Sequence, residues 1–273
     1  MSLAMLPYVV PPSVSVSLPL LGEQHLGVFG PLVALGLVLG WRRCLRYAEV
    51  HGIEAETARR LMEVVLVVGF CVSHWVSIIF YFPHRIAEDP LVLLWIPAGL
   101  SSVGGFVGAW LGLAWFARRH ALPMRRLADM LVYGLLLGFC LGRVGCAWVH
   151  DHPGRIADAS AWLAVGPWPS GVYRYDLGLL ELGLCIVLLA VVHLAFDWRG
   201  AAAGRLTGLV AVGYAGVRFV LDFFRATTAV GGGTPDPRYA GLTVAQYATI
   251  TFALAGLWLL SSRRATTKKA LAQ

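Results

Sequence analysis

Charged residues are scarce in this sequence, and this scarcity limits what the chain can be. Only 14% of its 273 residues are charged, while 58% are hydrophobic and the mean hydropathy is +0.70. An ordinary soluble domain carries about 25% charged residues, so the composition excludes a soluble interaction module. It predicts an all-α polytopic membrane protein that forms a single transmembrane domain over residues 1–273.

Lys and Arg are absent from the first 26 positions, and no two cysteines have C-x-x-C spacing. A secretory signal peptide needs a basic n-region, so residues 1–26 are predicted to be an extracytoplasmic arm. The sequence also lacks a low-complexity segment and a repeat of 20–50 residues. Four of the five cysteines fall within apolar runs, where we expect inert core thiols.

Seven apolar runs predict helices that cross about 30 Å of hydrocarbon, for which about 20 residues are needed. The first is short and its ends are the least defined. The Gly- and Pro-rich loops 150–176 and 225–243 are predicted to lie outside the cytoplasm, over one face of the bundle. The seven runs lie near 27–41, 61–82, 92–116, 130–149, 177–196, 206–224 and 244–261.

The net charge of +7 is distributed in a way that indicates topology rather than nucleic-acid binding. Of the Lys and Arg residues outside the predicted spans, 15 lie in alternate segments and 5 in the others. By the positive-inside rule the N-terminus is outside and the C-terminus is cytoplasmic. The richer segments are 42–60, 117–129, 197–205 and 262–273; the poorer ones are 83–91, 150–176 and 225–243.

Two basic residues, Arg143 and Arg218, remain inside the predicted spans. A buried guanidinium is costly unless it is paired or hydrated, so such a residue is functional by default. The two residues lie at similar positions along predicted spans of the same direction, about 18–20 Å from the inner side. Asp222 follows Arg218 by four residues and can pair with it, which would be a purely internal neutralisation. Two arginines with a single close acid indicate instead a bound anion, such as the phosphate of an outer-leaflet lipid.

Other polar and small residues are predicted to lie near the same depth. His74 is on the second span, and Ser101, Gly104 and Gly105 are on the third. Glycines allow helices to pack closely or a ligand to approach the backbone. A site built from several helices is therefore expected.

Several motifs carry a family resemblance. G-R-V-G at 142–145 is followed by Asp151 and Gly154, and Y-x-x-x-R-F-x-x-D-x-x-R spans 214–225. In these segments the chain resembles the prolipoprotein diacylglyceryl transferase family. The match continues in AGLSSVGGFVG (98–108), VYRYDLGLLE (172–181) and GLTVAQ (241–246).

The resemblance implies a reaction in the bacterial inner membrane. The diacylglyceryl group of phosphatidylglycerol passes to the thiol of a lipobox cysteine in a preprolipoprotein, and glycerol phosphate is released. Arginines aimed at the departing phosphate would stabilise the transition state. The partners would be these two substrates and membrane lipids, with no cofactor.

The resemblance also implies a set of site residues. Arg143 and Arg218 would bind phosphate, with Asp222 orienting Arg218. Tyr214, Asp151, Ser101 and Cys146 would support the substrate site. Glycines that let lipid or neighbouring backbone come close would be Gly104, Gly105, Gly142, Gly145 and Gly154.

The chain departs from the family pattern at several of these positions. Val103 stands where the family has a histidine before two glycines, and Cys146 stands where it has an asparagine. His74 replaces an arginine, Phe29 a tyrosine, and Asp151 and Asp222 replace glutamates. Val103 cannot handle a proton. His74, at a similar depth, is therefore the candidate for a catalytic proton-handling role.

The H-D-H run at 150–152 raises the question of a metal. Alternate residues of a helix point to different sides, and no further His or Cys has convincing ligand spacing, so we expect no metal. Cys146, one turn beyond Arg143, is expected to be a packing substitution for asparagine rather than a nucleophile.

Three alternatives remain open at this stage. The chain could bind lipid without turnover, as a degenerate paralogue, or transfer another lipid-derived group. Intramembrane charges also mark transporters, although no charged route continues inward from the two arginines.

Overall fold

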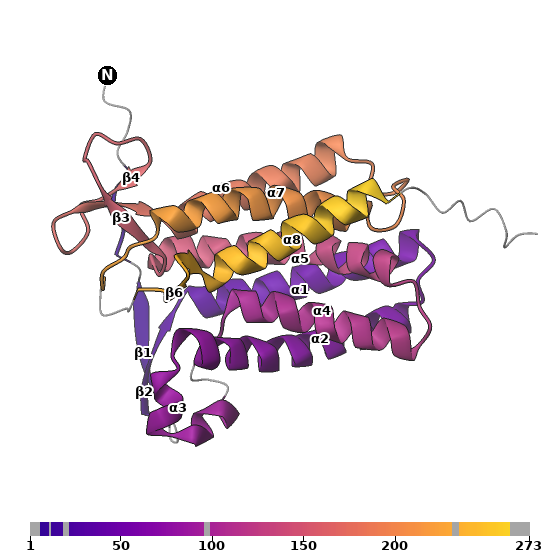
Figure 1. Cartoon of the computed structure of the whole chain (residues 1–273), viewed down its shortest axis with the longest axis horizontal. Coiled ribbons are helices and arrows are strands. Elements are labelled where there is room, and N and C mark those ends of the chain that lie inside the picture. The colour runs from indigo at the N-terminus through magenta and orange to yellow at the C-terminus, as the bar shows by residue number, and fades with distance from the viewer. Residues whose placement is uncertain (1–5, 11, 19–21, 96–98, 231–234, 263–273) are drawn as a thin grey trace, which may run out of the picture.

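The computed structural model describes residues 6–10, 12–18, 22–95, 99–230 and 235–262. Five of its helices are long and apolar enough to cross a membrane. In the bundle of Figure 1 the first, second and fourth of them run in one direction, and the third and fifth run in the other. The five are Ala55–Tyr81 (α2, Ala55–Val76, continued by the π-helix η1, Ser77–Tyr81), α5 (Met124–Val149), Leu177–Ala195 (α6, Leu177–Ala190, with η4, Val191–Ala195), Arg205–Phe224 (α7, Arg205–Leu221, with η5, Asp222–Phe224) and α8 (Val244–Ser261).

Two further long helices, α1 (Phe29–Val50) and α4 (Ser102–Arg119), pack within the same bundle. Arg42, Arg43 and Arg46 interrupt the apolar run of α1, and Arg118 and Arg119 end α4. These charges explain why neither helix qualifies as a span by composition. The multi-pass helical fold is confirmed, and the count of seven spans stays a prediction.

The predicted span 92–116 is wrong in its first residues. Residues 84–94 form two short helices, α3 (His84–Glu88) and η2 (Pro90–Leu94), and α4 begins only at Ser102. Gly99 has φ +149°, which favours glycine and ends any helix there. Ser101 is the N-cap of α4, and its hydroxyl accepts a hydrogen bond from the Gly104 amide at 3.4 Å. Ser101 and Gly104 therefore lie at a helix start, not in its middle.

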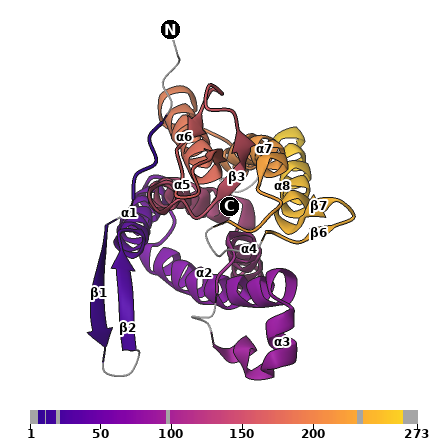
Figure 2. The same ribbon diagram turned by 90° about the vertical axis from the view of Figure 1, so that its left-hand side faces the viewer.

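Short antiparallel strands, which the all-α prediction lacked, gather at one end of the bundle, at the left of Figure 1 and toward the viewer in Figure 2. The predicted arm holds a hairpin, and the predicted loops 150–176 and 225–243 hold a three-stranded sheet and a small hairpin. Residues 1–5 of the arm and the basic segment 263–273 lie outside the described residues. The strands are β1 (Ser13–Leu18), β2 (Gly22–Gly27), β3 (Pro153–Ala157), β4 (Ala164–Val165), β5 (Tyr173–Asp176), β6 (Arg238–Tyr239) and β7 (Leu242–Thr243).

The N-terminal arm is fastened to the three-stranded sheet. Leu6 exchanges backbone hydrogen bonds with Ala164 and Gly166 at 3.2 and 3.0 Å. Tyr8 stacks on His150, with ring centroids 4.3 Å apart, and leans on Trp168. The arm and the loop 150–176 thus form one cap over the ends of α5 and α6.

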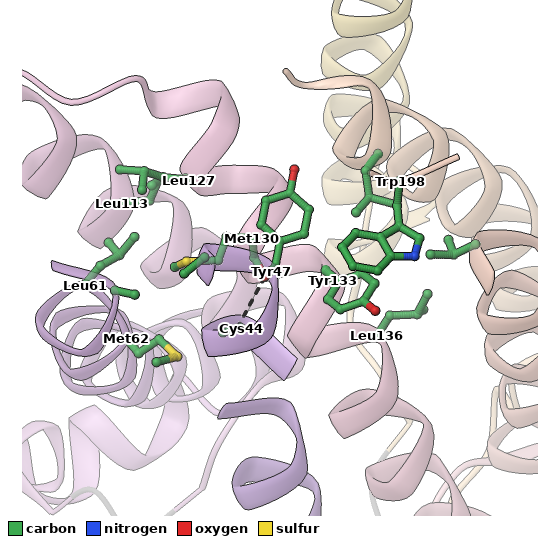
Figure 3. Close-up of a cluster of buried hydrophobic side chains, with 14 of the residues drawn as sticks. Cys44, Tyr47, Leu61, Met62, Leu113, Leu127, Met130, Tyr133, Leu136 and Trp198 are labelled. Carbon is green, nitrogen blue, oxygen red and sulfur yellow. Dashed lines mark hydrogen bonds between the residues drawn. The ribbon is translucent and has the colours of Figure 1, made fainter. Parts of the chain in front are cut away.

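The opposite half of the bundle is closed by a hydrophobic core (Figure 3). Tyr47 from α1, Tyr133 from α5 and Trp198 pack their rings together, with centroids 4.4–5.9 Å apart. The thiol of Cys44 donates to the Met130 carbonyl at 3.3 Å. This packing fixes α5 at the end remote from Arg143.

Helices α1 and α5 cross at glycines. A Cβ on Gly138 would lie 2.8 Å from the Gly36 carbonyl oxygen, and one on Gly36 would lie 2.7 Å from that of Gly138. Within a membrane such small residues let backbones approach where lipid tails give no hydrophobic drive. This close crossing sets the position of α5.

Gly138→Ala is therefore expected to destabilise the protein, because the new methyl group meets backbone that cannot rotate away. Overpacking of this kind costs about 1–3 kcal/mol. Gly183→Ala in α6 is the matched control, since a Cβ there meets nothing within 4 Å. Thermal unfolding in detergent should show a lower Tm for Gly138→Ala only; equal Tm values would contradict the crossing.

Candidate functional site

Arg143 and Arg218 meet at one carboxylate. Nη2 of Arg143 lies 2.6 Å from Oε2 of Glu181, and Nε of Arg218 contacts Oε1 of the same residue. The residues are buried, with 3%, 7% and 1% exposure for Arg143, Arg218 and Glu181. The two arginines therefore share a level, as predicted. The expectation of a single close acid is wrong.

The local sequence explains this convergence. Arg143 is six residues before the end of α5 and Arg218 is three before the end of α7, so both are about 5–9 Å from the same end of the bundle. Helix α6 starts at that end, where the Asp176 side chain caps it by accepting from the Leu179 amide at 3.1 Å. Glu181 is thus carried to the same level from the opposite direction.

Asp222 is a second carboxylate that is contacted by two arginines, as Glu181 is. It pairs with Arg218, as predicted from their i,i+4 spacing, and with Nε of Arg225 at 3.2 Å. The hydroxyl of Thr243, the N-cap of α8, also donates to its carboxylate. Asp222 therefore ties the ends of α7 and α8 together while it orients Arg218.

Aromatic rings surround the arginine pair. The guanidinium of Arg143 lies over the ring of Phe139, 4.8 Å from its centroid. Tyr214, buried one turn before Arg218, contacts Phe139 and Phe106, with centroids 5.6 and 6.1 Å apart. The arginine side chains are buried among these rings, and burial strengthens the charge interactions between them.

One donor of the site has no acceptor among the described residues. Nε of buried Arg143 has no hydrogen-bond partner there, although Nη1 contacts the sulfur of Cys146 at 3.7 Å. A buried donor left unpaired costs about 1–3 kcal/mol. The arrangement can therefore accept an anionic oxygen without breaking the Arg143–Glu181 pair.

Beyond the end of α5 the chain turns back at His150, whose φ of +53° is left-handed. His150 points to Asp176, with Nδ1 2.5 Å from Oδ2. Asp151 and His152 instead approach Cys146, and the ligand atoms of these three residues all lie within 4.8 Å of one another. The two imidazoles of the H-D-H run thus serve different neighbours.

The surroundings shift two of these groups. Burial raises the pKa of Asp151 to about 6, an effect that Arg143 opposes and Asp176 reinforces. Burial lowers the pKa of His152 to about 3, and the nearby charges of Arg143 and Arg225 add to this. His152 is therefore a neutral imidazole at pH 7.

His74 is fully buried, and both its ring nitrogens are occupied. Nδ1 lies 3.0 Å from the Gly99 carbonyl oxygen and Nε2 lies 2.9 Å from that of Val92. The Ser73 hydroxyl donates to the Ser101 carbonyl at 2.7 Å nearby. This geometry suits the fastening of the segment between α2 and α4 better than the proton-handling role predicted for His74.

The five predicted site glycines fall into two groups. Gly104, Gly145 and Gly154 are packed closely: a Cβ would lie 2.6–2.8 Å from Ser73 and Val72, from Phe29, and from the Tyr175 carbonyl, respectively. Gly105 and Gly142 have nothing within 4 Å of a Cβ. Only these last two leave room for a ligand.

A cavity of about 520 Å³ lies beyond the end of α5, with Val149 and His150 in its lining. It lies between the N-terminal arm and the two predicted loops, with Tyr8, Asp151, Trp168, Arg225 and Asp236 among its lining residues. Arg225 is held there by Asp236 at 3.1 Å. The cavity reaches the group of Cys146, Asp151 and His152 through Asp151.

Sequence reasoning missed Glu181 as a site residue. It is the last residue of the motif VYRYDLGLLE and lies in a predicted span, so an acid in an apolar run was the available signal. Counting only basic residues inside the spans overlooked it.

Known proteins are similar to this chain over most of its length. Residues 16–262 match the family Prolipoprotein diacylglyceryl transferase. A phosphatidylglycerol–prolipoprotein diacylglyceryl transferase of Chromohalobacter salexigens is 30% identical over 248 residues, covering 88% of both chains. One from Sinorhizobium medicae is 29% identical over 280 residues, covering 96% of this chain and 95% of its own. This chain belongs to the prolipoprotein diacylglyceryl transferase family.

Proposed function

We propose that the protein transfers the diacylglyceryl group of phosphatidylglycerol to the thiol of a lipobox cysteine. The observation that carries this proposal is the pair of buried guanidiniums held by Glu181, with the Nε donor of Arg143 to spare. Phosphate is the anion that two such forks recognise best. The relatives' names supply the acceptor.

The reaction requires charge stabilisation at the phosphate. The thiolate sulfur attacks the glyceryl carbon that carries the phosphate ester; a C–S bond forms and the C–O bond breaks. The electron pair leaves with the phosphate oxygen of glycerol phosphate. Arg143 and Arg218 would meet this growing negative charge in a buried site, where fixed donors lower the barrier most.

The neighbouring residues would divide the substrates between them. Gly105 and Gly142, beside open space, would let the lipid approach the arginines. The cavity beyond the end of α5, lined by Asp151 and Arg225, would admit the lipobox segment. Tyr214 and Asp222 would hold the arginines in place, and His74 with Ser101 would hold the start of α4.

The proposed placement is a bacterial inner membrane crossed seven times, with the N-terminus outside. The predicted outer loops 83–91, 150–176 and 225–243 lie at one end of the bundle, which supports this topology (Figure 1). The site would then open toward the outer leaflet, where both substrates meet.

A lipidation assay tests the proposal. The full-length protein in nanodiscs, labelled phosphatidylglycerol and a lipobox peptide should yield a diacylglyceryl thioether, read by mass spectrometry. A peptide with Cys→Ser should yield none. If phosphatidylglycerol binds but no thioether forms, the chain is a lipid-binding paralogue and the proposal is wrong; uptake of a small anion would indicate a transporter.

A further inference from the structure

Arg143 and Arg218, held together by Glu181, form an arginine clamp. The group of Cys146, Asp151 and His152 is separate from this clamp but lies next to it. Cys146 is on the last turn of α5, and the left-handed His150 turns the chain so that Asp151 and His152 come back over it. Nδ1 of His152 lies 3.3 Å from Oδ1 of Asp151, and all three ligand atoms lie within 4.8 Å.

These side chains form a known type of ligand set. In a tetrahedral zinc site with bonds of about 2.0–2.3 Å, neighbouring ligand atoms are about 3.3–3.8 Å apart, so shifts of about 1 Å would close this one. A thiolate, an imidazole and a carboxylate together suit Zn²⁺ better than Mg²⁺ or Ca²⁺, which prefer oxygen. Three protein ligands are the pattern of catalytic zinc, which keeps a fourth position for substrate.

We propose that Cys146, Asp151 and His152 bind Zn²⁺, and that its fourth position takes the thiol of the lipobox cysteine. The second half of this proposal rests on the proposed function. It replaces the sequence-based expectation that no metal is bound and that Cys146 only fills space. That expectation did not include the turn at His150, which brings ligands from a helix and a loop together.

The local charges fit a dication. Arg143 and Arg218 are matched by Glu181 and Asp222, and Arg225 by Asp236. The guanidiniums are thus compensated without Cys146 and Asp151, which would contribute two negative charges to Zn²⁺. His150, the remaining imidazole of the run, is occupied by Asp176 and by the Val9 carbonyl at 3.1 Å.

The position of the metal would solve the activation of the nucleophile. A free thiol has a pKa of about 8.5 and is mostly protonated at pH 7, whereas a metal-bound thiol is deprotonated. Apart from Asp151 and His152, which would be zinc ligands, the candidate bases near the arginines are already engaged: His74 has both nitrogens on carbonyls, and Glu181 and Asp222 are held by arginines. Binding to Zn²⁺ would deprotonate the peptide thiol without a protein side chain as the base.

The thiol, the metal and the lipid phosphate would be close enough for a single displacement step. The peptide thiol would release its proton to solvent on binding Zn²⁺, and the thiolate would then attack the glyceryl carbon as glycerol phosphate leaves. The neutral thioether, a poorer ligand, would dissociate. Nη1 of Arg143 is 3.7 Å from the sulfur of Cys146. The metal-bound nucleophile and the phosphate bound to Arg143 would therefore lie next to each other. Asp151 lines the 520 Å³ cavity from which the peptide would reach the metal.

Metal binding is tested first, without lipid or peptide. The full-length protein in nanodiscs is stripped with a chelator and titrated with Zn²⁺ by calorimetry and with Co²⁺ by absorption. One equivalent should bind, and Co²⁺ should show a thiolate charge-transfer band and four-coordinate ligand-field bands. Cys146→Ser, Asp151→Asn and His152→Ala should each weaken binding by more than about 100-fold, because a second-shell change alone costs roughly 10–100-fold.

Two controls remove comparable groups elsewhere. Cys140→Ser changes a buried cysteine on the same helix, and His84→Gln removes an exposed imidazole. Both should bind the metal like the wild type. Absence of a stoichiometric metal, or equal binding by the ligand variants, would overturn the site.

The role of the metal is tested with the peptide. A lipobox peptide should intensify the Co²⁺ charge-transfer band as a second sulfur binds, and a Cys→Ser peptide should not. Thioether formation by the stripped protein should fall at least about tenfold and return with Zn²⁺. Full turnover without metal would refute this role and leave Asp151–His152 as the base, whereas metal binding without any transfer would count against the proposed function alone.

Discussion

Arg143→Ala is expected to abolish thioether formation. The guanidinium of Arg143 holds Glu181, lies over Phe139 and keeps Nε free for a phosphate oxygen, so no neighbouring group can replace it. Removal of one donor to a developing charge costs about 10²–10³ in rate, and here a full charge is lost as well. The lipidation assay in nanodiscs measures the effect.

Arg143→Lys is the sharper version of the same test. Lysine keeps the positive charge and can still neutralise Glu181, but a single ammonium cannot contact the carboxylate and a phosphate as a planar fork does. We expect a loss of at least about 100-fold with the fold intact. Arg119→Lys, the same change at an exposed position on α4, should leave the rate unchanged. Activity that survives Arg143→Ala or Arg143→Lys would disprove the clamp.

The two arginines show how far intramembrane charge alone predicts a site. Because an ionised group in an apolar run is energetically costly, Arg143 and Arg218 could be predicted as site residues from the sequence. The i,i+4 spacing predicted Asp222 as the partner of Arg218. Glu181 obeys the same rule, but its role depends on α6 running opposite to α5 and α7. That antiparallel arrangement brings distant sequence positions to one level.

The end of the bundle was harder to predict than its helices. Apolar runs give helices directly, but the start of α4 depends on Gly99 and on the Ser101 cap, which hydropathy does not record. The approach of Cys146 to Asp151 and His152 depends on one left-handed residue, His150. Non-glycine residues rarely adopt this conformation, so spacing rules based on regular helices missed the group.

Glu181→Gln is expected to produce the largest loss of stability. Among the described residues, Arg143 would be left without an ion-pair partner and Arg218 with Asp222 alone, and breaking a buried pair by removing one partner costs about 3–5 kcal/mol. Glu56→Gln is the matched control, since Glu56 is half-exposed and pairs with Arg59 and Arg60 at the surface. Such a surface pair contributes about 0–1 kcal/mol. Denaturant unfolding in mixed micelles compares the two variants.

The same variant separates support of the fold from support of the chemistry. If Glu181 only neutralises charge, each folded molecule of Glu181→Gln should turn over at the wild-type kcat. If it also orients both forks, kcat per folded molecule should fall by at least about 100-fold, because phosphate then meets arginines in the wrong geometry. The double variant Arg143→Met with Glu181→Gln should recover part of the stability, since Arg218 keeps Asp222, but none of the activity. An active double variant would show that the convergence on Glu181 serves packing alone.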